Sequence, residues 1–132
     1  MSGHVHTRLA LPARSDQLRL VRSAVRSLAA VAGADSDRID DMVVAVNEAC
    51  ANVITHAYGE EQGELHLLVD RREADLVFVV SDSGKPVIER RTAGAGLGLP
   101  MIRELSDSVT IEGPGDAGTV VVMTFALGRG AG

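Results

Sequence analysis

Hydrophobic and polar positions alternate along some stretches of the chain and repeat every three to four positions along others. Alternation is typical of a strand with one buried face, and the longer period is typical of an amphipathic helix. The alternating stretches predict strands over residues 4–11, 64–72, 75–82, 108–113 and 118–127. The longer period predicts a helix from the Ser15–Asp16 region to about Ala32, a second from Ser36 or Asp37 to Tyr58, and a third over residues 99–106.

The order of these elements predicts the fold class. Strands 64–72 and 75–82 are separated by a short turn, as are strands 108–113 and 118–127, so each pair is expected to form a hairpin. We therefore expect an α/β two-layer sandwich, in which a mixed, mostly antiparallel sheet carries its helices on one face. The chain is expected to form a single domain over residues 1–132.

A polar stripe runs along the second predicted helix. Glu48, Asn52 and His56 are spaced by four, which places them on one face of an α-helix, whereas the flanking positions are apolar. An amide oxygen suits Mg²⁺, and a carboxylate nearby suits a general base. Spacing alone leaves open whether this stripe binds a ligand or is a hydrogen-bonded seam in the core.

Two further stretches carry candidate chemistry. Asp82 ends an apolar strand and is followed by Gly84, so its carboxylate could accept a hydrogen bond from an exocyclic amine, or the stretch could be a simple turn. The long segment 83–98 has no periodicity and ends in Gly94, Gly96 and Gly98 before a helix. Glycines at a helix N-terminus let backbone amides approach phosphate oxygens, although the pattern is neither a Walker nor a Rossmann motif.

Length, charge and cysteine content exclude some classes of protein. The chain has 132 residues, a formal charge of −5 and one cysteine, Cys50. The acidic balance argues against direct nucleic-acid binding. The absence of a long apolar run or a signal-peptide pattern argues against a membrane segment and favours the cytoplasm.

The ordered motifs are more specific together than apart. They are EACANVITHAYG (48–59), SDSGKP (81–86), GLGLPMIRELSD (96–107) and GTVVVMTF (118–125). This set resembles the ATP-binding superfamily of gyrase, heat-shock chaperone, histidine kinase and mismatch-repair proteins, which has the Bergerat fold. Within it, the chain resembles the anti-sigma-factor serine kinases of bacterial partner-switching systems.

The resemblance implies a role for each matching residue. Glu48 would be the general base, and Asn52 would coordinate Mg²⁺ bound to the ATP phosphates. Asp82 would bind the adenine amino group, Gly84 would leave room for the base, and Thr119 would support the adenine through a water. The remaining positions implied are Gly94, Gly96, Leu97 and Gly98 around the phosphates, residues 85–95 as a short lid, and His56 in a structural role near the helix end.

The resemblance also implies partners: a STAS-type anti-anti-sigma protein as substrate, a sigma factor, and a second copy of the chain in a homodimer. Two departures bear on phosphoryl transfer. Pro86 stands where the family has a second glycine, and the stretch 93–95 lacks the arginine that some family kinases carry, with Arg90 and Arg91 the nearest. A nucleotide-gated protein-binding regulator without kinase activity is therefore the alternative, and a stand-alone ATPase is a third possibility.

Other polar residues are interpreted as surface positions. His4 and His6 alternate on the first strand without an evident metal-binding partner. Arg19, Arg22 and Arg26 form a basic stripe on the first helix, which is either a solvated face or a docking face for an acidic partner.

Overall fold

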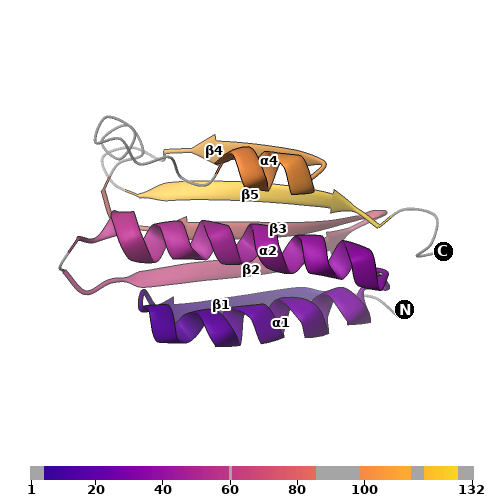
Figure 1. Ribbon diagram of the computed structural model, residues 1–132, viewed down its shortest axis with the longest axis horizontal. Helices are drawn as coiled ribbons and strands as arrows, with labels where there is room; N and C mark the ends of the chain where they lie inside the picture. Colours follow the sequence, from indigo (N-terminus) through magenta and orange to yellow (C-terminus); the bar gives the residue numbers. More distant parts are fainter. Residues whose placement is uncertain (1–4, 60, 86–98, 114–117, 128–132) are drawn as a thin grey trace.

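The computed structural model describes residues 5–59, 61–85, 99–113 and 118–127. Its elements form two layers, a sheet and a set of helices that lie on one of its faces (Figure 1). In chain order they are β1 (His6–Pro12), η1 (Ser15–Gln17), α1 (Leu18–Val31), α2 (Ser36–Asn52), η2 (Val53–Ala57), β2 (Glu64–Arg72), β3 (Asp75–Asp82), α4 (Leu99–Leu105), β4 (Ser108–Glu112) and β5 (Thr119–Ala126). The predicted two-layer α/β sandwich is confirmed.

The sheet has the strand order β1-β2-β3-β5-β4, and each of the pairings between described strands is antiparallel. Both predicted hairpins, β2–β3 and β4–β5, are present. The register sets Asp82 at the end of β3 opposite Thr119 at the start of β5. Two candidate residues that are far apart in the sequence are thus neighbours at the ends of two adjacent central strands.

Strand alternation explains which side chains form the core. On β2, Leu65, Leu67 and Val69 are buried while Glu64 and His66 are exposed, as expected when one face packs against helices. The rings of Phe78 on β3 and Phe125 on β5 meet edge to face at 5.7 Å between centroids. The helices add the remaining core residues, among them Val21, Val25, Met42 and Val46.

The helices begin and end close to their predicted positions, for identifiable reasons. The Asp35 side chain accepts a hydrogen bond from the Arg38 backbone N–H at 2.9 Å and so caps α2 one residue before the predicted start. A 3₁₀ turn over Ser15–Gln17 precedes α1 without a side-chain cap. Gly33 and Gly59, with φ of 93° and 63°, occupy the left-handed conformation that ends a helix.

The end of the second helix differs from the prediction. We expected one regular helix to Tyr58, but α2 ends at Asn52 and continues as a π-helical turn, η2, over Val53–Ala57. Hydrogen bonds in a π turn span five residues instead of four, so the winding of the chain changes immediately after Asn52. The run of β-branched residues Val53, Ile54 and Thr55 is a weak sequence signal for this, because such residues crowd the preceding helical turn.

Arg38, near the start of α2, connects this helix to the ends of α4 and β5. Its guanidinium donates to the carbonyl oxygens of Leu105 and Ala126, at 3.3 Å each, pairs with the Asp107 carboxylate, and lies 5.1 Å above the ring centroid of Phe125. The same carboxylate accepts a hydrogen bond from the Ala126 backbone N–H at 2.5 Å. The end of α4 is therefore fixed against α2 and β5.

Candidate functional site

The polar stripe begins in the last two turns of α2. Glu48 and Asn52 are half-buried there, between the fully buried neighbours Ala49, Cys50 and Val53. The Nδ2 atom of Asn52 is buried and has no hydrogen-bond partner among the described residues. Leaving a buried amide unpaired costs about 1–3 kcal/mol. A bound ligand would remove this cost, which favours the ligand-binding interpretation of the stripe over a satisfied polar seam.

The third member of the stripe lies in a different kind of helix. His56 belongs to η2, so the α-helical spacing from which we expected it to stack on Asn52 does not apply to it. Glu48 and Asn52 keep that spacing because both lie within α2. π turns of this kind are frequent at functional sites, and this one starts at the residue that follows Asn52.

Asp82 ends β3 with a carboxylate that is held in place. The residue is 6% exposed, and its Oδ1 accepts a hydrogen bond from the Gly84 backbone N–H at 2.9 Å. This side-chain-to-backbone bond closes a local turn and orients the carboxylate. The turn interpretation of this stretch is therefore correct in geometry, and it is compatible with recognition of a ligand.

Gly84 is required by a close approach of two backbone segments. A β-carbon at this position would collide with the carbonyl group and the β-carbon of Ala57, the last residue of η2. The next residue, Lys85, donates its backbone N–H to that carbonyl oxygen at 2.7 Å. The end of the π turn and the loop after β3 are thus in direct contact, a reason for glycine that the sequence did not supply.

The start of β5 lies beside the end of β3 and completes the candidate site. Thr119 is 2% exposed, and its Oγ1 is buried without a hydrogen-bond partner among the described residues. Gly118, with φ of 86°, donates its N–H to the Gly84 carbonyl oxygen at 2.7 Å, and a β-carbon there would collide with the Asp82 carbonyl oxygen. The sequence motifs include Ala57 and Gly118 but assign them no role, because their importance lies in long-range backbone contacts.

The structure thus brings Asp82, Gly84 and Thr119 together beside the end of the helix that carries Glu48 and Asn52. The glycine-rich stretch, with Gly94, Gly96, Leu97 and Gly98, lies outside the described residues, as do most of the predicted lid, Pro86, Arg90, Arg91 and the stretch 93–95. Their predicted roles stay predictions.

Comparison with known proteins relates this geometry to a family. Residues 11–125 match the family described as histidine kinase-like ATPase domain. The chain is 31% identical to the serine-protein kinases RsbW of Bacillus cereus (strain AH187) and Bacillus thuringiensis (strain Al Hakam), over 90% of this chain and 83% of each relative. The chain belongs to the histidine kinase-like ATPase family, in the branch of the serine-protein kinases RsbW.

A solved structure agrees with this assignment. The crystal structure of the RsbU and RsbW domains of Rv1364c from Mycobacterium tuberculosis superimposes with a TM-score of 0.75 at 25% identity. The match covers 92% of this chain and 32% of that one, so the present chain spans about a third of that protein. The expected membership of the anti-sigma kinase family and the Bergerat-type fold are confirmed.

The buried, unpartnered Asn52 Nδ2 of this RsbW-type domain is a donor that fits a phosphate oxygen, and the Asn52 Oδ1 is the kind of oxygen ligand that Mg²⁺ takes. The described residues contain no cluster of three or more histidine, cysteine or acidic side chains that could hold a metal by themselves. Mg²⁺ needs few protein ligands, because phosphate oxygens and waters complete its octahedral shell. One amide oxygen, that of Asn52, would therefore suffice where the phosphates are present.

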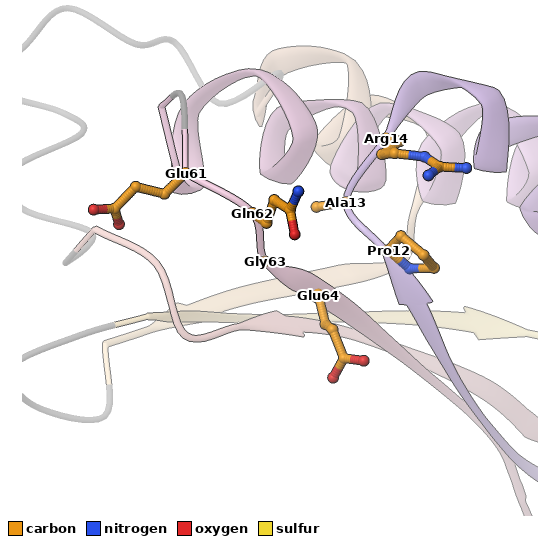
Figure 2. A pocket seen from close by; sticks show the side chains of 7 residues that line it. All are labelled: Pro12, Ala13, Arg14, Glu61, Gln62, Gly63 and Glu64. Atoms are coloured by element: carbon orange, nitrogen blue, oxygen red, sulfur yellow. The ribbon is translucent and has the colours of Figure 1, made fainter.

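The larger surface pockets do not coincide fully with these residues. A pocket of about 650 Å³ is lined by Gly84 and Lys85 together with Ala57–Gly59, Glu61, Gln62 and Ser83. Figure 2 shows a pocket of about 500 Å³ between Pro12–Arg14 and Glu61–Glu64, which contains none of the predicted site residues. The candidate site therefore rests on the buried polar groups, because buried groups without partners gain most from a bound ligand.

Two sets of surface residues have partners that the sequence did not reveal. His6 Nδ1 lies 3.1 Å from Asp70 Oδ1 across the β1–β2 ladder, and Arg72 Nε lies 2.8 Å from the other oxygen. The Arg72 guanidinium, followed by His6, lowers the pKa of the Asp70 carboxyl below its ordinary value. His6 is therefore part of an exposed polar cluster on the helix-free face.

The basic stripe of α1 is directed partly toward α2. Arg22 donates to the Asn47 side chain at 2.9 Å, and Arg26 pairs with Asp40 at 3.0 Å. Both pairs are exposed, so each contributes little to stability. Because two of the three arginines have partners within the chain, the docking-face hypothesis loses support.

Proposed function

We propose that this chain is an ATP-dependent serine protein kinase and anti-sigma factor. It phosphorylates a serine of a STAS-type anti-anti-sigma protein and sequesters a sigma factor. The observation that carries the proposal is a set of buried polar groups. The Asn52 Nδ2 atom and the Thr119 hydroxyl have no hydrogen-bond partner among the described residues, and Thr119 lies opposite Asp82, whose carboxylate is fixed. The names of the relatives support the activity, since both are serine-protein kinases.

The site residues divide the work of phosphoryl transfer. ATP supplies the γ-phosphoryl group. The Asn52 amide oxygen would hold a Mg²⁺ ion, which would supply charge neutralisation at the phosphates when bound. Asp82 accepts a hydrogen bond from the adenine amino group, and Thr119 supports the base through a water. The glycines at 94, 96 and 98, with Leu97, surround the phosphates.

Glu48 activates the acceptor in this proposal. Its carboxylate takes the proton of the substrate serine hydroxyl as the serine oxygen bonds to the γ-phosphorus, while the bond from that phosphorus to the β,γ-bridging oxygen breaks and ADP leaves. Glu48 lies one helical turn before Asn52 on α2, so base and metal ligand share one rigid support. Positioning of this kind supplies most of the catalysis in phosphoryl transfer.

The partners follow from the same proposal. The sigma factor and the anti-anti-sigma protein compete for the chain, which acts as a homodimer in the cytoplasm, where transcription takes place. Within the described ranges, no helix has the length and apolar character needed to cross a membrane. The alternative, a nucleotide-gated regulator without transfer activity, is favoured by the lack of an arginine at 93–95.

Calorimetric titration of Mg²⁺-ATP is the first test, with the wild-type chain and with Asp82→Asn. Loss of the charged acceptor should weaken binding by about ten- to a hundredfold, the equivalent of one hydrogen bond to a charged group. Failure of the wild-type chain to bind ATP would contradict the proposal.

Phosphoryl transfer is tested separately, with γ-labelled ATP and candidate STAS-type proteins from the same organism. Glu48→Gln should abolish labelling of the partner serine and leave ATP affinity within about twofold, because the substituted group acts on the hydroxyl and not on the nucleotide. Glu112→Gln, the same change at an exposed position on β4, is the matched control. Transfer that survives Glu48→Gln would exclude Glu48 as the base, and ATP binding without any transfer by the wild type would support the regulator.

A further inference from the structure

Tyr58, the residue that follows η2, connects two segments that are distant in the sequence. Its hydroxyl donates a hydrogen bond to the Glu64 carbonyl oxygen at 2.5 Å and accepts one from the Ser83 backbone N–H at 3.0 Å. Glu64 is the first residue of β2, and Ser83 follows the last residue of β3. A single phenol oxygen thus links the helix end, the start of one strand and the end of its neighbour.

The ring of Tyr58 has a fixed seat on the protein. A β-carbon at Gly63 would overlap the ring atoms, so the phenol lies against the bare backbone at that position. Figure 2 shows Gly63 and Glu64 where the chain enters β2. The Gly63 carbonyl oxygen in turn accepts a hydrogen bond from the Ala13 N–H at 2.9 Å, which ties this segment to the end of β1. The phenol therefore has a defined position.

The segment held by Tyr58 is the one that follows the Asp82 carboxylate. The backbone N–H groups of three consecutive residues are each satisfied by a specific partner: Ser83 by the Tyr58 hydroxyl, Gly84 by the Asp82 carboxylate and Lys85 by the Ala57 carbonyl oxygen. Two of these three partners belong to the end of the helix. Without the phenol oxygen, the exposed Ser83 N–H would bind water in place of its protein partner, and the turn that holds Asp82 would lose one of its three fixed contacts.

We propose that Tyr58 is a positioning residue that orients Asp82 for recognition of the adenine base. The inference rests on the proposed function, in which Asp82 accepts a hydrogen bond from the adenine amino group. Tyr58 does not touch the nucleotide in this proposal. It fixes Ser83, and through Ser83 the turn in which the Asp82 carboxylate is held.

Selectivity between purines is the property that this role controls. Adenine presents an amino donor at C6, whereas hypoxanthine presents a carbonyl oxygen, which a carboxylate repels. A well-oriented Asp82 therefore favours ATP over ITP, and a loosened Asp82 loses part of that preference. A purely structural role of Tyr58 would weaken the binding of both nucleotides equally.

The experiment is calorimetric titration of Mg²⁺-ATP and Mg²⁺-ITP with the full chain as wild type and as Tyr58→Phe. The phenylalanine keeps the ring on Gly63 and removes only the hydroxyl. We expect the Kd for ATP to rise about tenfold and the Kd for ITP to stay within about twofold, so that the ATP/ITP preference falls by about five- to tenfold. Gly63→Ala, which displaces the ring but keeps the hydroxyl, should lower the preference in the same direction.

Arg38→Met is the control for general destabilisation, because Arg38 stabilises α4 and β5 through contacts remote from Tyr58. It should leave the ATP/ITP preference unchanged. An unchanged preference in Tyr58→Phe, or equal weakening of both nucleotides, would overturn the inference while leaving the nucleotide site intact. A wild-type chain that binds ATP and ITP equally would overturn both the inference and the proposed adenine contact.

Discussion

Cys50 lies two positions before Asn52 on α2, yet its side chain is fully buried in the core. Burial raises the pKa of the Cys50 thiol to about 12, because the thiolate would lose its hydration. The two residues therefore have different environments on one helix. The amide of Asn52 needs a partner, whereas the thiol of Cys50 is neutral and unreactive in the folded chain.

Cys50 should consequently report unfolding. We expect a thiol reagent such as iodoacetamide to label Cys50 only as fast as the chain opens. Because the folded pKa is raised, the thiol's contribution to stability is fully present below the unfolded pKa near 9 and is lost as the pH rises toward 12. Between pH 8 and 10 the free energy of unfolding should fall by about 1 kcal/mol less in Cys50→Ala than in the wild type, as measured by urea unfolding. Rapid labelling of the native chain at pH 8 would contradict this burial.

At the residue scale the other decisive group is Gly84. Its sequence context suggested space for a base, whereas the structure shows that the Ala57 carbonyl group occupies the place of its missing side chain. A glycine can thus be essential because of a backbone contact. The sequence identified the position, and only the packing of η2 against the loop supplied this reason.

At the scale of elements, α4 is the helix whose position depends most visibly on one side chain. Arg38 on α2 reaches the last residue of α4, the Asp107 carboxylate and the end of β5. α4 has seven residues, which is too short for a helix to be stable by itself.

Replacement of Arg38 should loosen this corner. Arg38→Met keeps an apolar stem over Phe125 but removes the guanidinium, so the carbonyl oxygens of Leu105 and Ala126 and the Asp107 carboxylate lose a donor. We expect about 1–3 kcal/mol of destabilisation in urea unfolding, because the arginine side chain is mostly buried. Hydrogen exchange should increase first in α4 and β4. Arg26→Met, which removes an exposed pair with Asp40, should cost less than 1 kcal/mol. Equal effects of the two changes would contradict the role given to Arg38.

At the scale of the whole molecule, the candidate residues lie at one end. At the opposite end, Arg38 connects α2 to α4 and β5. The candidate end comprises the end of η2, the loop after β3 and the start of β5, joined by backbone hydrogen bonds. A ligand bound there would contact both layers at once. Its binding free energy therefore adds to the stability of the fold as a unit.

Nucleotide binding should thus raise the melting temperature. At an ATP concentration of 100 times Kd, with Mg²⁺ in excess, the expected stabilisation is about 2.7 kcal/mol. For a chain of 132 residues this is a rise in Tm of about 10 °C. Removal of Mg²⁺ with EDTA should reduce the rise, since the Asn52 amide oxygen then has no ion to bind. Asp82→Asn, which should bind about ten- to a hundredfold more weakly, should leave a rise of only about 1.5–5 °C at the same ATP concentration. A rise that is insensitive to both would place the nucleotide elsewhere.

The sequence by itself determined the elements and most of the candidate residues. Strand and helix periods depend on neighbouring positions, so the five strands, both hairpins and the two-layer arrangement were predictable. The motifs are also short local patterns, and they contain Glu48, Asn52, Asp82, Gly84 and Thr119. Because these motifs are local, the family could be predicted from them.

Only the tertiary structure decided how these parts meet. The π turn after Asn52 changes the helical winding, which the periodicity of the sequence did not predict. Three contacts join residues that local periodicity does not relate: Ala57 with Gly84, Tyr58 with Ser83, and Arg38 with Asp107. The last two span 25 and 69 positions of the chain. Such contacts depend on the packing of complete layers, in which a glycine or a phenol matters because of what lies against it in space.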